Sequence, residues 1–275
     1  MKRYRIFSFD FDSRAHGLDP APDEWDDKAK EMHEENRKRA FEGLKYEFGE
    51  LSLDEKIKNF VELKFKPFSV LSFHNKFLEQ VRNAFVIGSY YPALTGACAL
   101  GERILNHLML TFREYHKASP EYKKVYRKDS FDSWTLTIDT LLSWEILLPE
   151  PGDKFRALSE KRNSSIHFNP ETDHNDRDLA LEAIHLLQEI VAGQFAAFGN
   201  LPWLFIVPGE CYIKKEWETT PFVQHIYLPN CALVGPKHEI QTMIPRTVVN
   251  DQFEYEDRDV TDEEYAELRR SRRQR

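Results

Sequence analysis

Between residues 70 and 198 the chain carries apolar side chains at the spacing of an α-helix. Short groups of Pro, Gly and polar residues divide this stretch into segments of ordinary helix length. Helices with one apolar face are stable when those faces pack together, so the stretch predicts a helical bundle. The predicted helices cover residues 70–87, 91–117, 131–148, a segment that begins near Asp153, and 176–198.

The segments on either side of the bundle have a different pattern. Residues 1–22 begin with the alternating run YRIFSFDF, which predicts a strand. Residues 23–48 predict one or two exposed amphipathic helices that end at Gly49. After residue 199, runs rich in β-branched and aromatic residues predict two to four antiparallel strands.

We therefore expect a mainly α protein in four parts. These are an N-terminal extension with a strand and helices (1–69), a helical bundle (70–198), a β-rich region (199–250) and a mobile charged tail (251–275). A hydrophobic share of 41% in 275 residues is enough for a packed core. The formal net charge of −8 argues against a general nucleic-acid coat protein, but it allows a small basic site that holds one phosphate.

Cysteine use and hydropathy indicate a cytoplasmic protein. The three cysteines lie far apart and form no CxxC pair, which favours a reducing compartment. The N-terminus becomes acidic too early for a signal peptide. The uncharged stretch 83–101 has about the length of a bilayer span, but the sequence GSYYP interrupts it, and we expect a buried helix and no membrane partner.

No motif for a metal or a cofactor is present. The sequence has no HExxH, no cysteine pair at zinc spacing, no P-loop and no GxGxxG after a strand, so we expect neither. The run IFSFDFDS resembles the start of haloacid-dehalogenase-type phosphatases, with Asp10 as nucleophile and Asp12 as acid and base. That fold needs alternating strands and helices after the motif, whereas residues 23–198 read as helical. The alternative places both aspartates on the polar side of a peripheral strand.

The run RNSSIH, residues 162–167, is the strongest candidate for chemistry. On a regular helix, residues four apart differ by about 40°, so Asn163 and His167 share a face. Arg162 and His167 are five apart and differ by about 140°. They can converge only through a distorted turn or through a second copy of the chain across a two-fold axis.

This run resembles the R-x(4–6)-H signature of the HEPN superfamily, whose members are helical-bundle domains. The upstream run GSYYPALTGACALGERILNHLML also resembles the second helix of that family, with Glu102 at its acidic position. The resemblance covers residues 70–198. It implies a metal-independent endoribonuclease that acts on RNA, with tRNA among the candidates. It also implies a homodimer with the site at the interface, a role as a toxin or antiviral effector in abortive infection, and restraint by an antitoxin or regulatory protein.

The residue types fit cleavage of RNA by its own 2′-hydroxyl. Histidine exchanges protons near neutral pH, so His167 is assigned to proton transfer. Arg162 stabilises the charge on the phosphate, and Asn163 positions it. Glu102 orients Arg162 or the histidine; the alternatives for Glu102 are an ion pair with a local arginine such as Arg103, or a solvated carboxylate.

Other interpretations remain open for the same residues. Arg162 could be an ordinary surface residue and His167 a helix-end residue, and a HEPN-like domain can serve as a non-catalytic scaffold that binds a nucleotide or a protein. Tyr90 and Tyr91 are candidates for stacking on bases of the substrate, with core packing as the alternative.

Overall fold

The computed structural model describes residues 1–166, 172–243 and 246–273. The chain forms two compact units, which are described one at a time. The first is Asp10–Gln194 and is helical; the second combines Met1–Phe9 with Phe195–Arg275 and contains a small sheet. The protein is therefore mainly α, as the sequence predicts.

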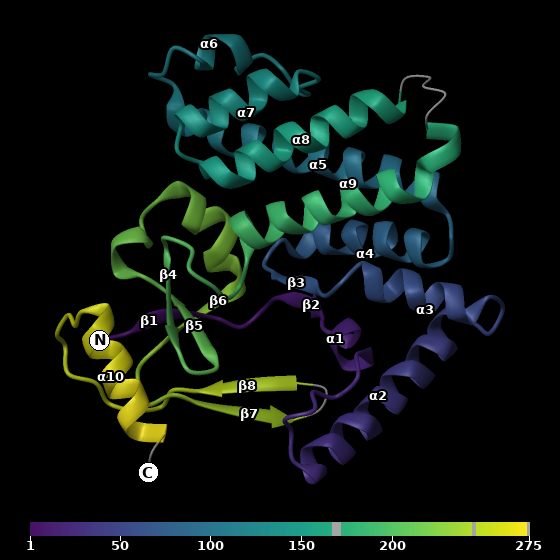
Figure 1. Cartoon of the computed structure of the whole chain (residues 1–275). Coiled ribbons are helices and arrows are strands. Elements are labelled where there is room, and N and C mark those ends of the chain that lie inside the picture. The colour runs from purple at the N-terminus through teal and green to yellow at the C-terminus, as the bar shows by residue number, and fades with distance from the viewer. Residues whose placement is uncertain (167–171, 244–245, 274–275) are drawn as a thin grey trace. The chain divides into compact units, whose positions relative to one another are not determined.

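The helical unit contains a two-stranded sheet and a series of helices (Figure 1). The strands β2 (Asp10–Asp12) and β3 (Lys66–Ser69) pair antiparallel. The helices are α1 (Arg14–Leu18), α2 (Asp27–Phe48), α3 (Leu53–Glu62), α4 (Ser72–Val86), α5 (Tyr90–Phe112), η1 (Arg113–His116), α6 (Tyr122–Val125), α7 (Trp134–Ser143), α8 (Pro149–Ile166) and α9 (Thr172–Phe195).

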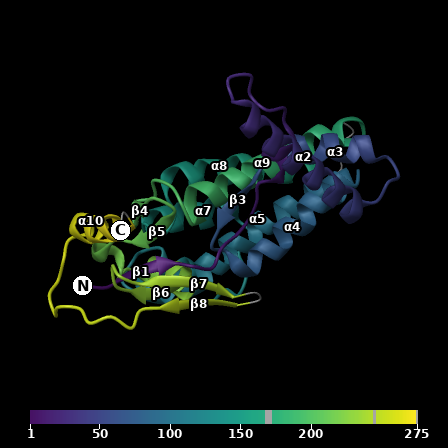
Figure 2. The same cartoon turned by 90° about the horizontal axis from the view of Figure 1, so that it is seen from below.

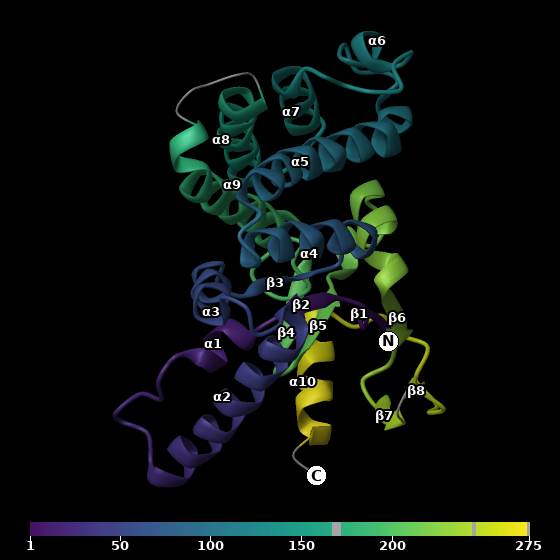
Figure 3. The ribbon, with the colours of Figure 1, turned by 90° about the vertical axis from the view of Figure 1, so that its right-hand side faces the viewer.

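Helix α5 is the centre of this unit. Its buried side chains run from Ala93 to Phe112 and cover about half of its circumference, which gives a wide apolar face for other helices to pack against. Figure 3 shows α4 on one side of α5 and α7 and α8 on the other, in agreement with its packing contacts. Among the described residues, no helix is long and apolar enough to cross a membrane.

The helix boundaries differ from the predicted ones where proline and glycine act locally. Helix α8 begins at Pro149, although the sequence PEPG was expected to close the preceding helix. The first turn of a helix has no partner for its N–H groups, so prolines are tolerated there. Helix α2 ends as predicted at Gly49, whose φ of 76° suits a residue without a side chain.

The second unit is built on a four-stranded antiparallel sheet in the order β4-β5-β1-β6. Its strands are β1 (Arg3–Ile6), β4 (Leu204–Val207), β5 (Glu210–Ile213) and β6 (Cys231–Val234). A separate hairpin joins β7 (Glu239–Met243) to β8 (Arg246–Asn250), as Figure 2 shows. Short helices η2 (Lys215–Trp217), η3 (Val223–Tyr227) and η4 (Leu228–Asn230) follow β5, and helix α10 (Asp262–Arg273) ends the described chain.

Three features of this unit differ from the expectation. The N-terminal strand pairs with β5 and β6 instead of belonging to an extension of the bundle. Five strands, where two to four were expected, lie between residues 199 and 250 in the described part. Residues 262–273, expected within a mobile tail, form helix α10, because its Tyr265 and Ala266 are buried with Tyr212 of β5.

A buried charge cluster ties α10 to the sheet. The side chain of Glu210 on β5 is inaccessible to solvent. Its carboxylate lies 2.8 Å from Arg5 of β1 and accepts two hydrogen bonds of 2.8 Å from Arg269 of α10. A buried carboxylate needs opposite charges and hydrogen bonds to stay ionised, and the two arginines supply both.

Candidate functional site

Helices α5 and α8 pack closely and run in opposite directions, since Gly101 contacts Leu158 while Cys98, earlier on α5, lies beside Ser165, later on α8. A Cβ atom at Gly101 would lie only 2.7 Å from Leu158 Cδ2 and 2.9 Å from Trp134 Cη2. The glycine therefore permits the close approach of α5 to α7 and α8. This approach determines which polar side chains of the helices meet.

Glu102 and Arg162 meet at this contact. Glu102 Oε2 lies 3.0 Å from Arg162 Nε, which links the residue after Gly101 to the penultimate turn of α8. Arg103, the alternative partner for Glu102, instead lies over the ring of Phe77, with its guanidinium carbon 5.1 Å from the ring centroid. Of the predicted arrangements, the structure has the one in which Glu102 contacts Arg162; its role in catalysis stays a prediction.

Trp134 supports the carboxylate of this pair. Its indole Nε1 donates a hydrogen bond of 3.2 Å to Glu102 Oε2, and the indole itself is buried. The side chains of Arg162 and Glu102 remain 26% and 32% exposed. Trp134 thus holds the carboxylate that pairs with Arg162, and part of the Arg162 side chain remains accessible to solvent or to an anion.

Asn163 and His167 complete the predicted group. Asn163 is exposed on α8, one residue after Arg162. His167 lies outside the described residues, so its predicted convergence with Arg162 stays a prediction. Regular helix extends to Ile166, which places Arg162 and Asn163 inside helical geometry.

Cys98 lies beside this group, but its environment keeps it protonated. Burial raises the pKa of the Cys98 thiol to about 11, and the hydrogen bond with Ser165 and the charge of Arg162 offset only part of this rise. A thiol with this pKa is not a nucleophile near neutral pH. Arg162 is therefore the group in this cluster that is suited to an anionic substrate.

The two candidate stacking residues lie elsewhere on α5. Tyr90 is twelve residues before Glu102, about 18 Å along the helix. Its hydroxyl accepts a 3.1 Å hydrogen bond from Asn59 and lies 3.3 Å from Glu55, and the Arg177 guanidinium lies 5.8 Å from its ring centroid. Tyr90 is thus committed to a local polar cluster that involves α3 and α9.

Tyr91, in contrast, is 50% exposed. Its ring is available to a ligand, but at a level of α5 far from Arg162. A stacking role for either tyrosine stays a prediction, and the structure does not bring the tyrosines together with the Arg162–Glu102 pair.

The N-terminal aspartates are engaged in ion pairs. Asp10 accepts a 2.5 Å hydrogen bond from the buried Lys66, and Asp12 pairs with Arg14 at 2.8 Å. Burial alone would raise the pKa of Asp12, but hydrogen bonds from Arg14 outweigh it and lower that pKa. Within the described ranges, no group of three or more His, Cys, Asp or Glu residues is arranged to hold a metal ion. The ion pairs of Asp10 and Asp12 match the alternative in which both aspartates lie on the polar side of a peripheral strand.

Sequence reasoning missed Trp134 as part of the site. The sequence showed only that Trp134 lies near the start of the helix predicted over 131–148. No local pattern could indicate that its indole bonds to a carboxylate 32 residues earlier.

No protein-family model, curated protein or solved structure matches this chain. Its function is therefore inferred from the residues of the site.

Proposed function

We propose that this protein is a HEPN-like, metal-independent endoribonuclease in which Arg162 binds the scissile phosphate. The observation that supports this most is the partly exposed Arg162 side chain, whose guanidinium is held against Glu102 on a neighbouring helix. A guanidinium offers several N–H donors in a planar fork that matches phosphate oxygens. Because Glu102, which is itself held by Trp134, fixes one side of the guanidinium, less conformational entropy is lost when a phosphate binds the other side.

The proposed reaction is a transesterification within the RNA. The 2′-oxygen attacks the adjacent phosphorus, the bond from phosphorus to the 5′-oxygen breaks, and the products are a 2′,3′-cyclic phosphate and a 5′-hydroxyl. His167 takes part by proton transfer, either from the 2′-hydroxyl or to the leaving 5′-oxygen. Arg162 stabilises the negative charge that accumulates on the phosphorane, and Asn163 helps to position the phosphate.

A homodimer is part of this proposal. Arg162 lies in regular helix, and a histidine five positions later would point about 140° away if that helix continued. A site shared across a two-fold axis would combine Arg162 of one copy with His167 of the other. The proposed biological role is that of a toxin or antiviral effector, restrained by an antitoxin or regulatory protein.

The test is cleavage of total RNA and of purified tRNA in the presence of EDTA. We expect cyclic phosphate ends from the wild type, and a rate at least about 100-fold lower for Arg162→Ala and His167→Ala. Arg156→Ala is the matched control, because Arg156 is also a partly exposed arginine on α8 with a carboxylate partner, Asp139. Its rate should equal that of the wild type.

Two results would contradict the proposal. If Arg162→Ala and His167→Ala cleave like the wild type, the activity belongs to another site or to a contaminant. If the intact protein cleaves none of these RNAs, the ribonuclease proposal is wrong for them.

The ion pair with Glu102 would also suit a non-catalytic module that binds a nucleotide or a protein, because it fixes Arg162 without requiring a reaction. Arg162-dependent binding of a labelled RNA without cleavage would support that alternative.

A further inference from the structure

The sheet unit has a cleft beside an open strand edge. Strand β4 is an outer strand of the β4-β5-β1-β6 sheet, and β5 pairs with one side of it. The cleft has a volume of about 920 Å³ and is lined by Phe205 and Ile206 of β4 and by one face of α10. All of its lining residues belong to this one unit.

The register identifies the backbone groups on the open side of β4. Residues of β4 and β5 pair antiparallel, with Ile206 opposite Cys211, and Lys214 N donates to Trp203 O at 2.9 Å at the end of the same ladder. Hydrogen-bonded and non-hydrogen-bonded pairs alternate in such a ladder. Counting from the bonded pair at Trp203, Phe205 and Val207 bond to β5, and Ile206 turns its N–H and C=O outward.

The side chain of Ile206 is also accessible, with 44% of its surface exposed. One residue thus offers a donor, an acceptor and an apolar contact at the sheet edge. These are the groups through which an extended peptide adds a strand to a sheet. An open edge of this kind favours another strand as its occupant.

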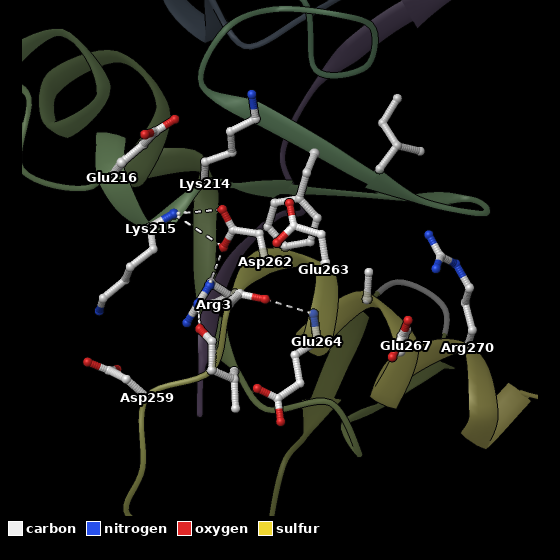
Figure 4. A pocket seen from close by; sticks show the side chains of 15 residues that line it. Arg3, Lys214, Lys215, Glu216, Asp259, Asp262, Glu263, Glu264, Glu267 and Arg270 are labelled. Atoms are coloured by element: carbon white, nitrogen blue, oxygen red, sulfur yellow. Dashed lines mark hydrogen bonds and ion pairs between the residues drawn. The ribbon is translucent and has the colours of Figure 1, made fainter.

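The charges around the cleft indicate the charge of the peptide strand that would bind there. Acidic residues in its lining outnumber basic ones by six to four. Arg3 is engaged with Asp262 at 2.7 Å, and Lys215 is paired with Glu218 at 3.1 Å. Figure 4 shows the acidic side chains along α10, where the exposed Glu263 and Glu267 lie one turn apart on the same face.

Neither Glu263 nor Glu267 forms an ion pair with another described residue. A peptide with Lys or Arg at alternate positions could pair with them while its apolar residues contact Ile206, because side chains of a strand alternate between faces. A second copy of this chain would bring the same excess of acids to the edge, which is unfavourable for self-pairing. The charge therefore favours a basic partner over a dimer through β4.

We propose that β4 and α10 form a docking groove for an extended peptide segment that alternates apolar residues with lysine or arginine, added as a new strand at the β4 edge. The main support is that the N–H and C=O of Ile206 point outward beside a cleft bordered by Glu263 and Glu267. This proposal concerns the sheet unit, so it can be correct or wrong independently of the proposed ribonuclease activity.

The test measures the binding of a fluorescein-labelled peptide of alternating lysine and valine to the full-length protein by fluorescence polarisation. A peptide of alternating glutamate and valine is the control. We expect the lysine peptide to bind at least about tenfold more tightly than the glutamate peptide, since opposite charges attract and like charges repel across the groove.

Two kinds of variant test separately how the strand edge and the acidic charge contribute to peptide binding. Ile206→Pro removes the outward N–H but no β4–β5 hydrogen bond, and an edge strand tolerates a proline at such a position. Ile206→Lys provides a second variant that keeps the backbone N–H and replaces the apolar contact with a positive charge. The pair Glu263→Lys and Glu267→Lys reverses the charge of α10.

The matched control is Glu150→Lys with Glu160→Lys, which changes the net charge equally in the helical unit. We expect at least a tenfold loss of lysine-peptide binding in each groove variant and none in this control. Equal binding of both peptides, no binding of either, or unchanged binding in folded groove variants would overturn the proposal. A dimer seen by light scattering and abolished by Ile206→Lys would also overturn it, in favour of a second copy at the edge.

Discussion

The substitution Glu210→Gln should strongly destabilise the sheet unit. The Glu210 carboxylate is fully buried, and the side chains of its partners Arg5 and Arg269 are only 8% and 7% exposed. Glutamine keeps the size of the side chain and removes its charge, so two buried guanidinium groups lose their counter-ion. Breaking a buried ion pair from one side costs about 3–5 kcal/mol, and we expect the free energy of unfolding to fall by that amount.

The loss should be greatest at helix α10. Arg269 bonds not only to Glu210 but also to the carbonyl oxygens of Pro236 and His238, at 3.1 and 2.6 Å. Weakening this anchor raises the fraction of molecules in which α10 is detached. Because α10 contains several arginines, trypsin followed by intact-mass spectrometry should detect C-terminal cleavage that is much faster in Glu210→Gln than in the wild type.

The matched control is Glu264→Gln, which removes a carboxylate from α10 itself. Glu264 pairs with Arg258 at 2.7 Å, but these side chains are 40% and 43% exposed, and such pairs contribute about 0–1 kcal/mol. Urea unfolding followed by circular dichroism gives both free energies. A loss below about 1 kcal/mol for Glu210→Gln, with wild-type tryptic rates, would refute the reasoning.

The same carboxylate predicts part of the acid sensitivity. Burial would raise the pKa of Glu210, but hydrogen bonds from Arg269 and Tyr212 and the charges of Arg5 and Arg269 outweigh it and lower the pKa to about 2. A lowered carboxyl pKa stabilises the folded state above the unfolded value of about 4.5. A difference of that size corresponds to about 3 kcal/mol, which is lost as the pH falls from about 4.5 to 2. Glu210→Gln should lack this contribution.

Four further substitutions test other residues. Burial lowers the pKa of His238 to about 4, so the folded state should lose stability as the pH falls from about 6.5 to 4, and His238→Asn should flatten this part of a plot of melting temperature against pH. Gly101→Ala should lower the free energy of unfolding by about 1–3 kcal/mol because its Cβ atom has no room. In contrast, Gly43→Ala, in open space on helix α2, should raise it by up to about 1 kcal/mol, as urea unfolding would measure. If the ribonuclease proposal holds, Glu102→Gln should slow RNA cleavage about tenfold, which is less than the effect of Arg162→Ala.

The helices of the bundle could be predicted because their apolar residues repeat locally. The helix predicted over 70–87 is observed at Ser72–Val86, and the centre of the unit is the helix predicted over 91–117. The contact of Glu102 on α5 with Arg162 on α8 was among the predicted arrangements. The two helix predictions depend on a pattern within about one helix length, whereas the contact was expected from the resemblance of two separate segments.

Helix α10 could not be predicted in this way. Its buried polar residue, Arg269, is stabilised by Glu210, which lies 59 residues earlier in the chain. In the sequence the segment reads as charged and mobile, because burial of an arginine depends on a counter-ion that no local pattern specifies. Strand β1 gives the same lesson: its alternation predicted a strand, but its partners β5 and β6 are contributed by the other end of the chain.

The Glu210 cluster and the Arg162–Glu102 pair differ in how far solvent reaches their side chains. Glu210 is enclosed by Arg5 and Arg269, so no ligand can reach it without unfolding the cluster. Arg162 and Glu102 keep 26% and 32% of their side chains exposed, and an exposed pair contributes about 0–1 kcal/mol to stability. If the ribonuclease proposal holds, Arg162→Ala should leave the free energy of unfolding nearly unchanged while it lowers the rate of RNA cleavage at least about 100-fold. If urea unfolding instead shows a loss of about 3 kcal/mol or more, the Arg162–Glu102 contact holds the bundle together, and its assignment to phosphate binding fails.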